Sequence, residues 1–391
     1  MPSPPDITIE VFGKTDVGLI REHNEDNFLV ADVTTALRTN DVKEPLKITL
    51  GDKGVLLLVC DGMGGAAAGE VASRMAVESI FDAIAGGEPQ PRDGFARAMR
   101  GAVEVANEKI FVQSRDNQSE RGMGTTCTTA ALVDQTLIVG QIGDSRCYVL
   151  RDGRLAQVTK DQSLAWQLIE AGAMTAEEAK AFEHANIILQ ALGVQEHVEV
   201  VLSQVDLRWG DVVVLCSDGL HGPVADDEML ELLQRETNLQ KAAEGLIQKA
   251  LDRDGPDNIT VVIARFTGAG LPAPTPEDLV TFVAYDPGPG PLSESSSSQD
   301  PSSFDHPVAA MLTVNERVPQ ELLSDEVVTE SVVERSGGAA GSSPRSAIRT
   351  ARSVLAFFFL ALVAAAAGGI FVTMKCEGDQ PVHSEGRGGG P

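Results

Sequence analysis

Unbroken apolar runs that end close to an Asp-Gly pair are the most regular feature of the chain. Residues Val55–Cys60 and Val212–Cys216 are apolar without alternation, which is typical of strands buried on both faces. Asp61 follows the first run directly, and Asp218 comes two residues after the second. Two buried strands therefore each deliver a carboxylate, with a glycine behind it, to the point where the strand ends.

Three further junctions repeat this arrangement of a strand and an acidic turn. The sequence predicts strands over Asn27–Ala31, Cys147–Leu150 and Ile259–Phe266, and a helical pattern begins at Gly69. Each of these strands has acidic residues directly ahead of it, or a few residues before it. These residues are Glu25, Asp26, Asp144 and Asp257, the last followed by Asn258.

Carboxylates at strand ends converge if the strands are neighbours, and convergence has an electrostatic cost. Two such charges about 4 Å apart repel by roughly 4 kcal/mol at an effective dielectric constant of 20. Divalent cations remove that cost, and an oxygen-rich site favours Mg²⁺ or Mn²⁺. No HExxH or paired-cysteine pattern indicates zinc. Each aspartate alone is better explained as a turn cap, but five junctions in succession favour a metal site.

The first glycine turn also satisfies a loose dinucleotide-binding pattern. Gly62, Gly64 and Ala67 have the required spacing, and Asp82 lies where a ribose-binding carboxylate is expected. Asp61 opposes this interpretation, because an anion at the head of the turn repels a pyrophosphate group. No Lys or Arg between Lys53 and Arg74 offsets that charge. The turn therefore favours a cation over a nucleotide phosphate.

Composition excludes some classes of function. The 391 residues are 43% hydrophobic but only 4% aromatic, which predicts a core of Val, Leu, Ile and Ala. A formal net charge of −26 argues against nucleic-acid binding, which requires a basic surface. The cysteines show no paired spacing, so we expect reduced, buried thiols in a cytosolic domain. The five cysteines are Cys60, Cys127, Cys147, Cys216 and Cys376.

The C-terminal third departs from the pattern of a soluble domain. Residues 268–353 are rich in Pro, Ser and Gly, which predicts a disordered linker. Val354–Met374 is uncharged over about 21 residues, long enough for a single transmembrane helix. Arginines precede this segment, which favours a cytoplasmic position for the residues N-terminal to it. The predicted organisation is a folded domain over 1–267, the linker, the helix over 354–374 and a polar tail over 375–391.

The folded part resembles the metal-dependent (PPM) serine/threonine protein phosphatases of type 2C, most closely their bacterial branch. The resemblance rests on several motifs in this order and extends from about Thr15 to Phe266. They are "TDVGLIREHNEDNF", "VCDGMGG", "GMGTTCTTAAL", "VGQIGDSRCYVLRDG", "KDQSLAWQLIEAGAMTAEEA", "VVLCSDGL" and "GPDNITVV". It implies an α+β fold, a four-layer αββα sandwich of two mainly antiparallel sheets flanked by helices, here with a C-terminal transmembrane helix. The flanking helices implied include Arg92–Ser114 and Leu239–Leu251.

The resemblance also implies roles for individual residues. Two Mn²⁺ or Mg²⁺ ions would share Asp61, and a third, weaker metal occurs in bacterial members. Arg21 would bind the substrate phosphate beside Asp61, and a metal-activated water would attack it. The implied metal ligands are Glu25, Asp61, the carbonyl of Gly62, Asp144, Asp218 and Asp257. Asp26 and Asn258 would not bind the metals directly but would lie next to the ligands and their bound waters.

Two departures from the family pattern concern the chemistry. Met63 stands where eukaryotic relatives often have a histidine acting as general acid, so a metal-bound water or His23 would protonate the leaving group. The flap expected over Ser163–Leu192 is shortened, which changes the expectation for substrate preference. His184 and His221 are interpreted as surface or turn residues. No CxxxxxR cradle follows Cys60 or Cys216, so a cysteine phosphatase is not indicated.

The expected substrates are phosphoproteins, with membrane-associated Ser/Thr kinases and their substrates as expected partners. The expected location is the bacterial inner membrane, with one helix in the lipid bilayer and the catalytic domain in the cytoplasm. A degenerate domain that binds phosphoproteins without turnover remains an alternative, as does a phosphatase for small phosphate esters. Retention of an oxygen ligand at every metal position favours an active enzyme.

Overall fold

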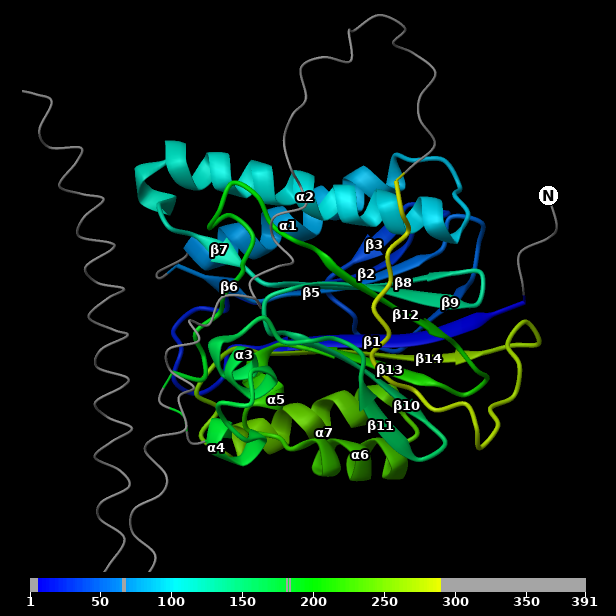
Figure 1. Ribbon diagram of the computed structural model, residues 1–391. Coiled ribbons are helices and arrows are strands. Elements are labelled where there is room, and N and C mark those ends of the chain that lie inside the picture. The colour runs from blue at the N-terminus through cyan, green and yellow to red at the C-terminus, as the bar shows by residue number, and fades with distance from the viewer. Residues whose placement is uncertain (1–5, 65–67, 181, 183, 290–391) are drawn as a thin grey trace, which may run out of the picture. The chain divides into compact units, whose positions relative to one another are not determined.

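Two stacked antiparallel sheets form the centre of the structure, a computed structural model that describes residues 6–64, 68–180, 182 and 184–289 (Figure 1). Each sheet has six strands, and all pairs within them are antiparallel. Sheet A has the strand order β11 (Arg154–Gln157), β10 (Arg146–Arg151), β13 (Val212–Cys216), β14 (Ile259–Thr267), β1 (Thr8–Asp16), β4 (Leu46–Thr49). Sheet B has the order β12 (Val201–Asp206), β9 (Thr136–Ile142), β8 (Cys127–Val133), β5 (Val55–Cys60), β2 (Asn27–Asp32), β3 (Leu37–Thr39).

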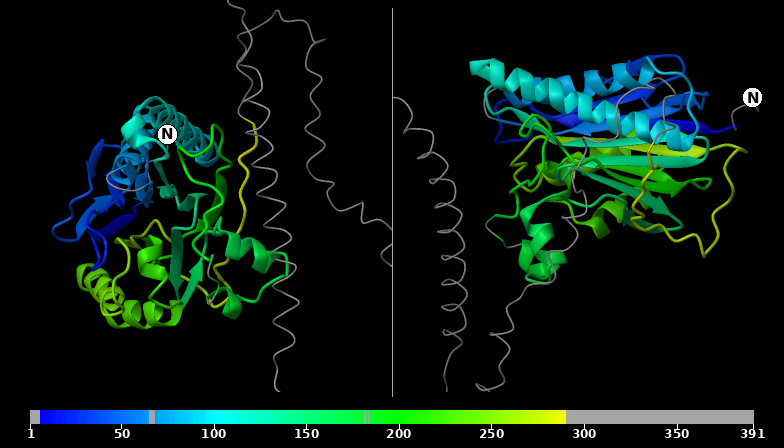
Figure 2. Two further views of the ribbon diagram at one scale, coloured as in Figure 1. Left: turned by 90° about the vertical axis from the view of Figure 1, so that its left-hand side faces the viewer. Right: turned by 45° about the horizontal axis from the view of Figure 1, so that its top comes forward.

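Helices cover the outer face of each sheet. In Figures 1 and 2, α1 and α2 lie on sheet B, and α6 and α7 lie on sheet A, so the layers run helix, sheet, sheet, helix. A short ribbon of β6 (Gly62–Met63) and β7 (Gly124–Thr125) stands apart from both sheets. The helices are α1 (Ala68–Ala85), α2 (Arg92–Asp116), α3 (Leu164–Glu170), α4 (Ala176–Lys180), α5 (Asp218–His221), α6 (Asp226–Arg235), α7 (Leu239–Leu251) and the 3₁₀ helix Gln118–Glu120.

Strand β5 shows why the central strands are apolar without alternation. All six of its residues are buried, and successive side chains point to opposite faces of the sheet. Val55, Leu57 and Val59 belong to the core between the two sheets. Leu56, Leu58 and Cys60 pack instead in the layer beneath α1 and α2. A strand with a hydrophobic core on each side needs apolar residues at every position.

Most elements predicted from the pattern are present. The strands predicted over Val55–Cys60 and Val212–Cys216 have those bounds, and the other strands and helices agree to within a few residues. The prediction of an α+β fold with two antiparallel sheets flanked by helices is confirmed. Among the described residues the cysteines are buried and free, as expected for reduced thiols. They are Cys60, Cys127, Cys147 and Cys216.

The chain after β14 differs from the prediction. Residues 268–353 were predicted to form a disordered linker, but residues 268–289 are described and bond to the domain through backbone and side chains. The Pro-rich composition did not predict these bonds, because they use backbone groups and a few charged side chains. The predicted helix over Val354–Met374 lies outside the described residues. In the described part of the chain, no helix is both long enough and apolar enough to cross a membrane.

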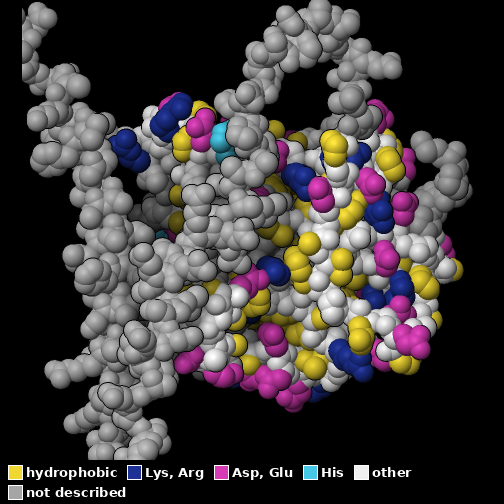
Figure 3. Space-filling view, in the orientation of Figure 1, with side chains coloured by type: hydrophobic (Ala, Val, Ile, Leu, Met, Phe, Trp, Pro, Cys, Tyr) yellow, Lys and Arg dark blue, Asp and Glu magenta, His cyan; other side chains and the backbone are white. Residues whose placement is uncertain are grey.

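The surface is acidic, in keeping with the net charge of −26. Figure 3 shows Asp and Glu side chains gathered along the lower edge of the face in view, with Lys and Arg scattered elsewhere. Many cationic side chains on the described surface are paired with carboxylates, as Lys160 is with Glu170 and Arg253 with Glu228. That the protein does not bind nucleic acid stays a prediction from its net charge.

Candidate metal centre

The carboxylates predicted from five separate junctions meet at one end of the stacked sheets. Hydrogen bonds join the junctions directly. The hydroxyl groups of Ser217 and Thr260 donate to Asp26 Oδ2 at 2.7 and 2.6 Å. These contacts link the start of β2 in sheet B to the end of β13 and the start of β14 in sheet A. Because the two sheets are tied together here, acidic residues from both face the same place.

The glycines after Asp61 and Asp218 are required by close backbone packing. A Cβ atom on Gly62 would collide with the carbonyl oxygen of Gly69 at the start of α1. A Cβ atom on Gly219 would collide with the carbonyl oxygen of Asn258. A larger residue at either position would push the preceding carboxylate away from the others. The glycines therefore let each Asp-Gly pair pack directly against the backbone of a neighbouring segment. These pairs are not ordinary surface turns.

Burial and mutual repulsion raise the pKa values of the clustered carboxyl groups. Desolvation, with repulsion from Asp218 and Asp257, raises the pKa of Asp26 to about 7, against two hydroxyl hydrogen bonds that lower it. Desolvation, with repulsion from Asp218 and Asp161, raises the pKa of Asp144 to about 8. Desolvation raises the pKa of Asp61 well above its ordinary value, and Asp26, Asp218 and Asp144 add to the shift. Without a cation the cluster holds protons near neutral pH.

Within the part of the chain that the structure describes, three buried carboxylate oxygens accept no hydrogen bond from the protein. They are Asp26 Oδ1, Asp144 Oδ1 and Asp218 Oδ1. Buried acceptors left without a partner are rare, and a cation or its bound waters would satisfy them. Across the described residues, no group of three or more His, Cys, Asp or Glu side chains is arranged so that it could hold a metal ion. Mg²⁺ and Mn²⁺ keep several waters and accept backbone carbonyl ligands, so a site for them can use fewer side chains.

Arg21 lies at the exposed rim of the acidic cluster. Its Nη2 donates to Asp257 Oδ2 at 2.7 Å, and about half of its side-chain surface is open to solvent. The loop that carries Arg21 is held by Asn258, whose Nδ2 donates to the carbonyls of Val17 and His23 at 2.9 Å. The Asn258 Oδ1 accepts the N–H of Glu25 at 2.7 Å. One amide side chain thus fixes the arginine, Glu25 and the Asp257 turn relative to one another.

Several supporting residues were not identified from the sequence. Thr126 Oγ1 accepts the N–H of Asp61 at 2.9 Å, and Thr125 Oγ1 donates to the carbonyl of Asp61 at 2.9 Å. Ser73 Oγ donates to the carbonyl of Glu25 at 2.6 Å. The threonine run in "GMGTTCTTAAL" was visible, but nothing in the pattern distinguishes hydroxyl groups that hold a ligand from those that only pack in a strand.

The histidines lie in different surroundings. His221 was interpreted as a surface or turn residue, but its Nε2 is 3.0 Å from the carbonyl oxygen of Asp144. Because a carbonyl only accepts, Nε2 carries the proton, and desolvation lowers the pKa of His221 to about 3. His221 therefore links the Asp144 turn to α5, which carries Asp218. His23 and His184 have exposed side chains.

The raised pKa values predict that the metal-free protein loses stability as pH rises. Asp26 and Asp144 hold protons more tightly when folded than when unfolded. Their contribution to the free energy of unfolding is therefore fully present below about pH 4. It is lost as the pH rises through about 7 to 8. From pH 6 to 8.5 we expect the free energy of unfolding to fall by about 4 kcal/mol in EDTA.

Thermal denaturation at the two pH values measures this effect. Saturating Mn²⁺ should abolish it, because the ions replace the protons as the neutralising charge. The Asp144→Asn variant should show a smaller decline in EDTA than the unaltered protein. Equal melting temperatures at pH 6 and 8.5 in EDTA would contradict the assignment of a self-repelling cluster.

The sequence and the fold both match known bacterial phosphatases. Residues 40–253 match the protein phosphatase 2C family. The serine/threonine phosphatase Stp of Listeria monocytogenes is 35% identical over 251 residues, which are 64% of this chain and 93% of that protein. The serine/threonine protein phosphatase PstP of Mycobacterium tuberculosis is 36% identical over 258 residues, which are 66% of this chain and 45% of that protein.

Solved structures agree in fold. The catalytic domain of PstP in complex with two manganese ions has a TM-score of 0.55 and 35% identity, covering 67% of this chain and 99% of that structure. The phosphatase Stp1 of Staphylococcus aureus has a TM-score of 0.59 and 30% identity, covering 66% of this chain and 94% of that structure. From these matches and the geometry of the site, the chain belongs to the protein phosphatase 2C family of serine/threonine phosphatases.

Proposed function

We propose that the chain hydrolyses phosphoserine and phosphothreonine in proteins, with two Mn²⁺ or Mg²⁺ ions at the acidic cluster. The observation that carries this proposal is the convergence of Asp61, Asp218 and Asp257 beside Arg21. PstP, which is similar in sequence and fold, binds two manganese ions in its catalytic domain. When bound, such ions would lower the pKa of a bound water and neutralise charge on the reacting phosphate.

The protein's own groups have separate tasks in this scheme. Asp61 and Asp218 would hold the ions, together with Asp257, Glu25 and the carbonyl of Gly62. Asp144 and Asp218 would supply the weaker third site. Asp26 would orient bound waters through Oδ1, since Oδ2 already accepts two hydroxyl groups. Arg21 has five N–H donors and gives one to Asp257, so others are free for a phosphate oxygen.

Removal of a single metal-binding carboxylate tests the proposed chemistry. Asp61→Asn and Asp218→Asn should each lower kcat by about 10³-fold or more, because a metal ion stabilises transition-state charge by several kcal/mol. The apo variants should be at least as stable as the unaltered protein, since each removes a repelling charge. The measurement is Mn²⁺-dependent phosphate release from a phosphothreonine peptide.

Asp134→Asn is the matched control for these variants. Asp134 lies in the turn between β8 and β9 with a φ of 55°, a conformation that asparagine accepts, and it lies outside the cluster. Near-normal turnover by Asp61→Asn at saturating Mn²⁺ would overturn the metal assignment. Hydrolysis of p-nitrophenyl phosphate without hydrolysis of any phosphopeptide would instead indicate a phosphatase for small esters.

Arg21→Ala should act mainly on phosphate binding. Loss of a charge-assisted hydrogen bond costs about 1.5–3 kcal/mol, so KM should rise by about 10- to 150-fold while affinity for Mn²⁺ changes little. Arg74→Ala, which breaks an exposed ion pair with Glu70, is the control. Steady-state kinetics and calorimetric Mn²⁺ titration separate the two effects. Weaker Mn²⁺ binding with an unaltered KM would refute this role of Arg21.

We further propose that Val354–Met374 anchors the enzyme in the inner membrane, with the catalytic domain in the cytoplasm. The uncharged length of the segment and the arginines before it support this. The predicted linker would let the domain reach membrane-associated Ser/Thr kinases and their substrates, whose phosphorylation it would reverse. Full-length protein should sediment with membranes, and a truncation after residue 289 should not. Recovery of the full-length protein in the soluble fraction would contradict the anchor.

A further inference from the structure

Two large hydrophobic side chains, Leu19 and Ile20, are exposed to solvent directly before Arg21. We name them the apolar pair. They are 63% and 68% exposed, which places both among the most exposed large hydrophobic residues of the described chain. Single exposed hydrophobic residues are common on protein surfaces and need no explanation. An adjacent pair beside the residue proposed to bind the substrate phosphate is a different case, because the neighbouring arginine indicates what could cover it.

The backbone that carries the apolar pair is held at several points. The N–H of Leu19 donates to the carbonyl of Gly255 at 2.8 Å. The side chain of Asn258 donates to the carbonyls of Val17 and His23, one on each side of the pair. A partner that covers the pair therefore does not have to order the loop first. Such a partner loses less binding free energy to conformational entropy.

Contacts with Asp257 place the apolar pair next to the acidic cluster. A Cβ atom on Gly18, which has a φ of 77°, would collide with the carbonyl oxygen of Asp257. Arg21 Nη2 donates to Oδ2 of the same aspartate at 2.7 Å. The residue before the pair and the residue after it therefore both contact a proposed metal ligand. A phosphate group bound by Arg21 would lie close to the pair.

A peptide that carries this phosphate can reach the apolar pair with its neighbouring residues. Consecutive Cα atoms are 3.8 Å apart, so residues one or two positions from a phosphothreonine lie within about 7 Å of it. Acidic side chains there are repelled by the acidic cluster and by the net charge of −26. Basic side chains are attracted by the acidic surface as a whole, so they do not account for the pair. A hydrophobic side chain gains by contact with the pair itself.

We propose that Leu19 and Ile20 determine specificity by binding a hydrophobic side chain within two residues of the phosphorylated residue. The preferred substrates are then phosphoproteins in which a phosphoserine or phosphothreonine has a hydrophobic neighbour. This inference rests on the proposed phosphatase function, because it places the substrate phosphate at Arg21.

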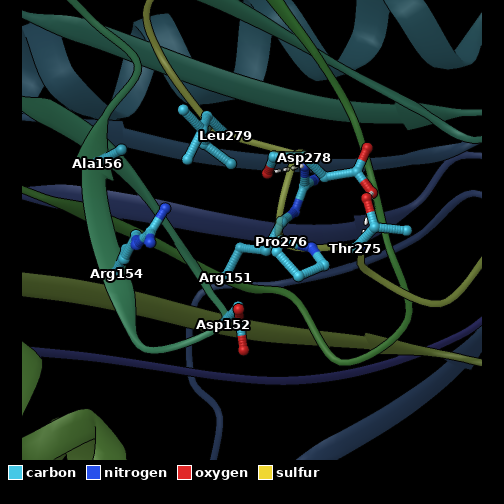
Figure 4. A pocket seen from close by; sticks show the side chains of 9 residues that line it. Arg151, Asp152, Arg154, Ala156, Thr275, Pro276, Asp278 and Leu279 are labelled. Atoms are coloured by element: carbon cyan, nitrogen blue, oxygen red, sulfur yellow. Dashed lines mark hydrogen bonds between the residues drawn. The ribbon is translucent and has the colours of Figure 1, made fainter.

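Leu279 provides a matched control away from the acidic cluster. It is also 63% exposed, and Figure 4 shows it at the small pocket that Arg151 lines as well. Arg151 is the last residue of β10, whereas Arg146, the first residue of that strand, comes two residues after Asp144. The length of a six-residue strand therefore separates this pocket from the Asp144 turn.

Two phosphothreonine peptides test the proposal with the full-length protein at saturating Mn²⁺. They differ only at the two positions on each side of the phosphothreonine, which are leucine in one peptide and serine in the other. The unaltered protein should hydrolyse the leucine peptide with a kcat/KM about fivefold higher, as partial burial of one leucine side chain provides.

Substitutions assign this preference to the apolar pair. Ile20→Ser should reduce the ratio of the two kcat/KM values, and the double variant with Leu19→Ser should bring it close to one. Ile20→Leu should keep the preference, because it keeps the hydrophobic surface. Leu279→Ser should keep it as well. Since all three side chains are exposed, we expect these variants to fold as the unaltered protein does.

Binding without turnover provides the second measurement. Non-hydrolysable phosphonate analogues of the two peptides, labelled for fluorescence anisotropy, report affinity alone. The unaltered protein should bind the leucine analogue about fivefold more tightly than the serine analogue, and the double variant should bind both equally.

Equal affinity of the unaltered protein for the two analogues would overturn the proposal. A preference that persists in the double variant, or that Leu279→Ser removes equally, would also overturn it. A failure of the phosphatase function gives a different result, because no protein would then release phosphate from either peptide. The anisotropy measurement would still decide whether the apolar pair binds the hydrophobic residue.

Discussion

The structure depends on the burial of several carboxylates at one end of two stacked sheets. Desolvation and mutual repulsion oppose this arrangement and raise the pKa values of Asp26, Asp61 and Asp144. The protein compensates only in part, through the hydroxyl groups on Asp26 Oδ2 and the arginine on Asp257. Other buried oxygens have no partner. Such a site is stabilised either by bound protons or by bound cations. A phosphate dianion can approach the site when cations are bound.

Much of the fold could be predicted from the sequence, because the central strands carry an unusual signal. Strand β5 packs against a hydrophobic core on each face, so its uninterrupted apolar pattern could not be confused with a half-exposed strand. The helices α1 and α7 also follow from periodicity or resemblance. The segment 270–288, which follows β14, could not be predicted in this way. Its Pro-rich composition is typical of disorder, and its contacts use backbone groups of Val283 and Tyr285 that any residue could supply.

The same distinction applies to the site. Carboxylates at strand ends were visible because charge next to an apolar run is conspicuous, and the structure brings them together. The residues that hold them were much harder to find. Thr126 supports Asp61 through a hydroxyl, and His221 supports Asp144 through a ring nitrogen. A threonine or a histidine at these positions cannot be recognised as a supporting residue until the structure shows the aspartate beside it. The sequence therefore predicts which groups bind the metals better than it predicts which groups position them.

The central claim is that cations replace protons at the acidic cluster, and proton release on metal binding tests it most directly. Calorimetric titration of the metal-free protein with Mn²⁺ near pH 6.5, in two buffers with different ionisation enthalpies, counts the protons released. Because Asp26 and Asp144 have pKa values of about 7 and 8, the account predicts binding of two or more ions with release of about one proton or more. Binding without proton release, or no binding of Mn²⁺, would contradict the account.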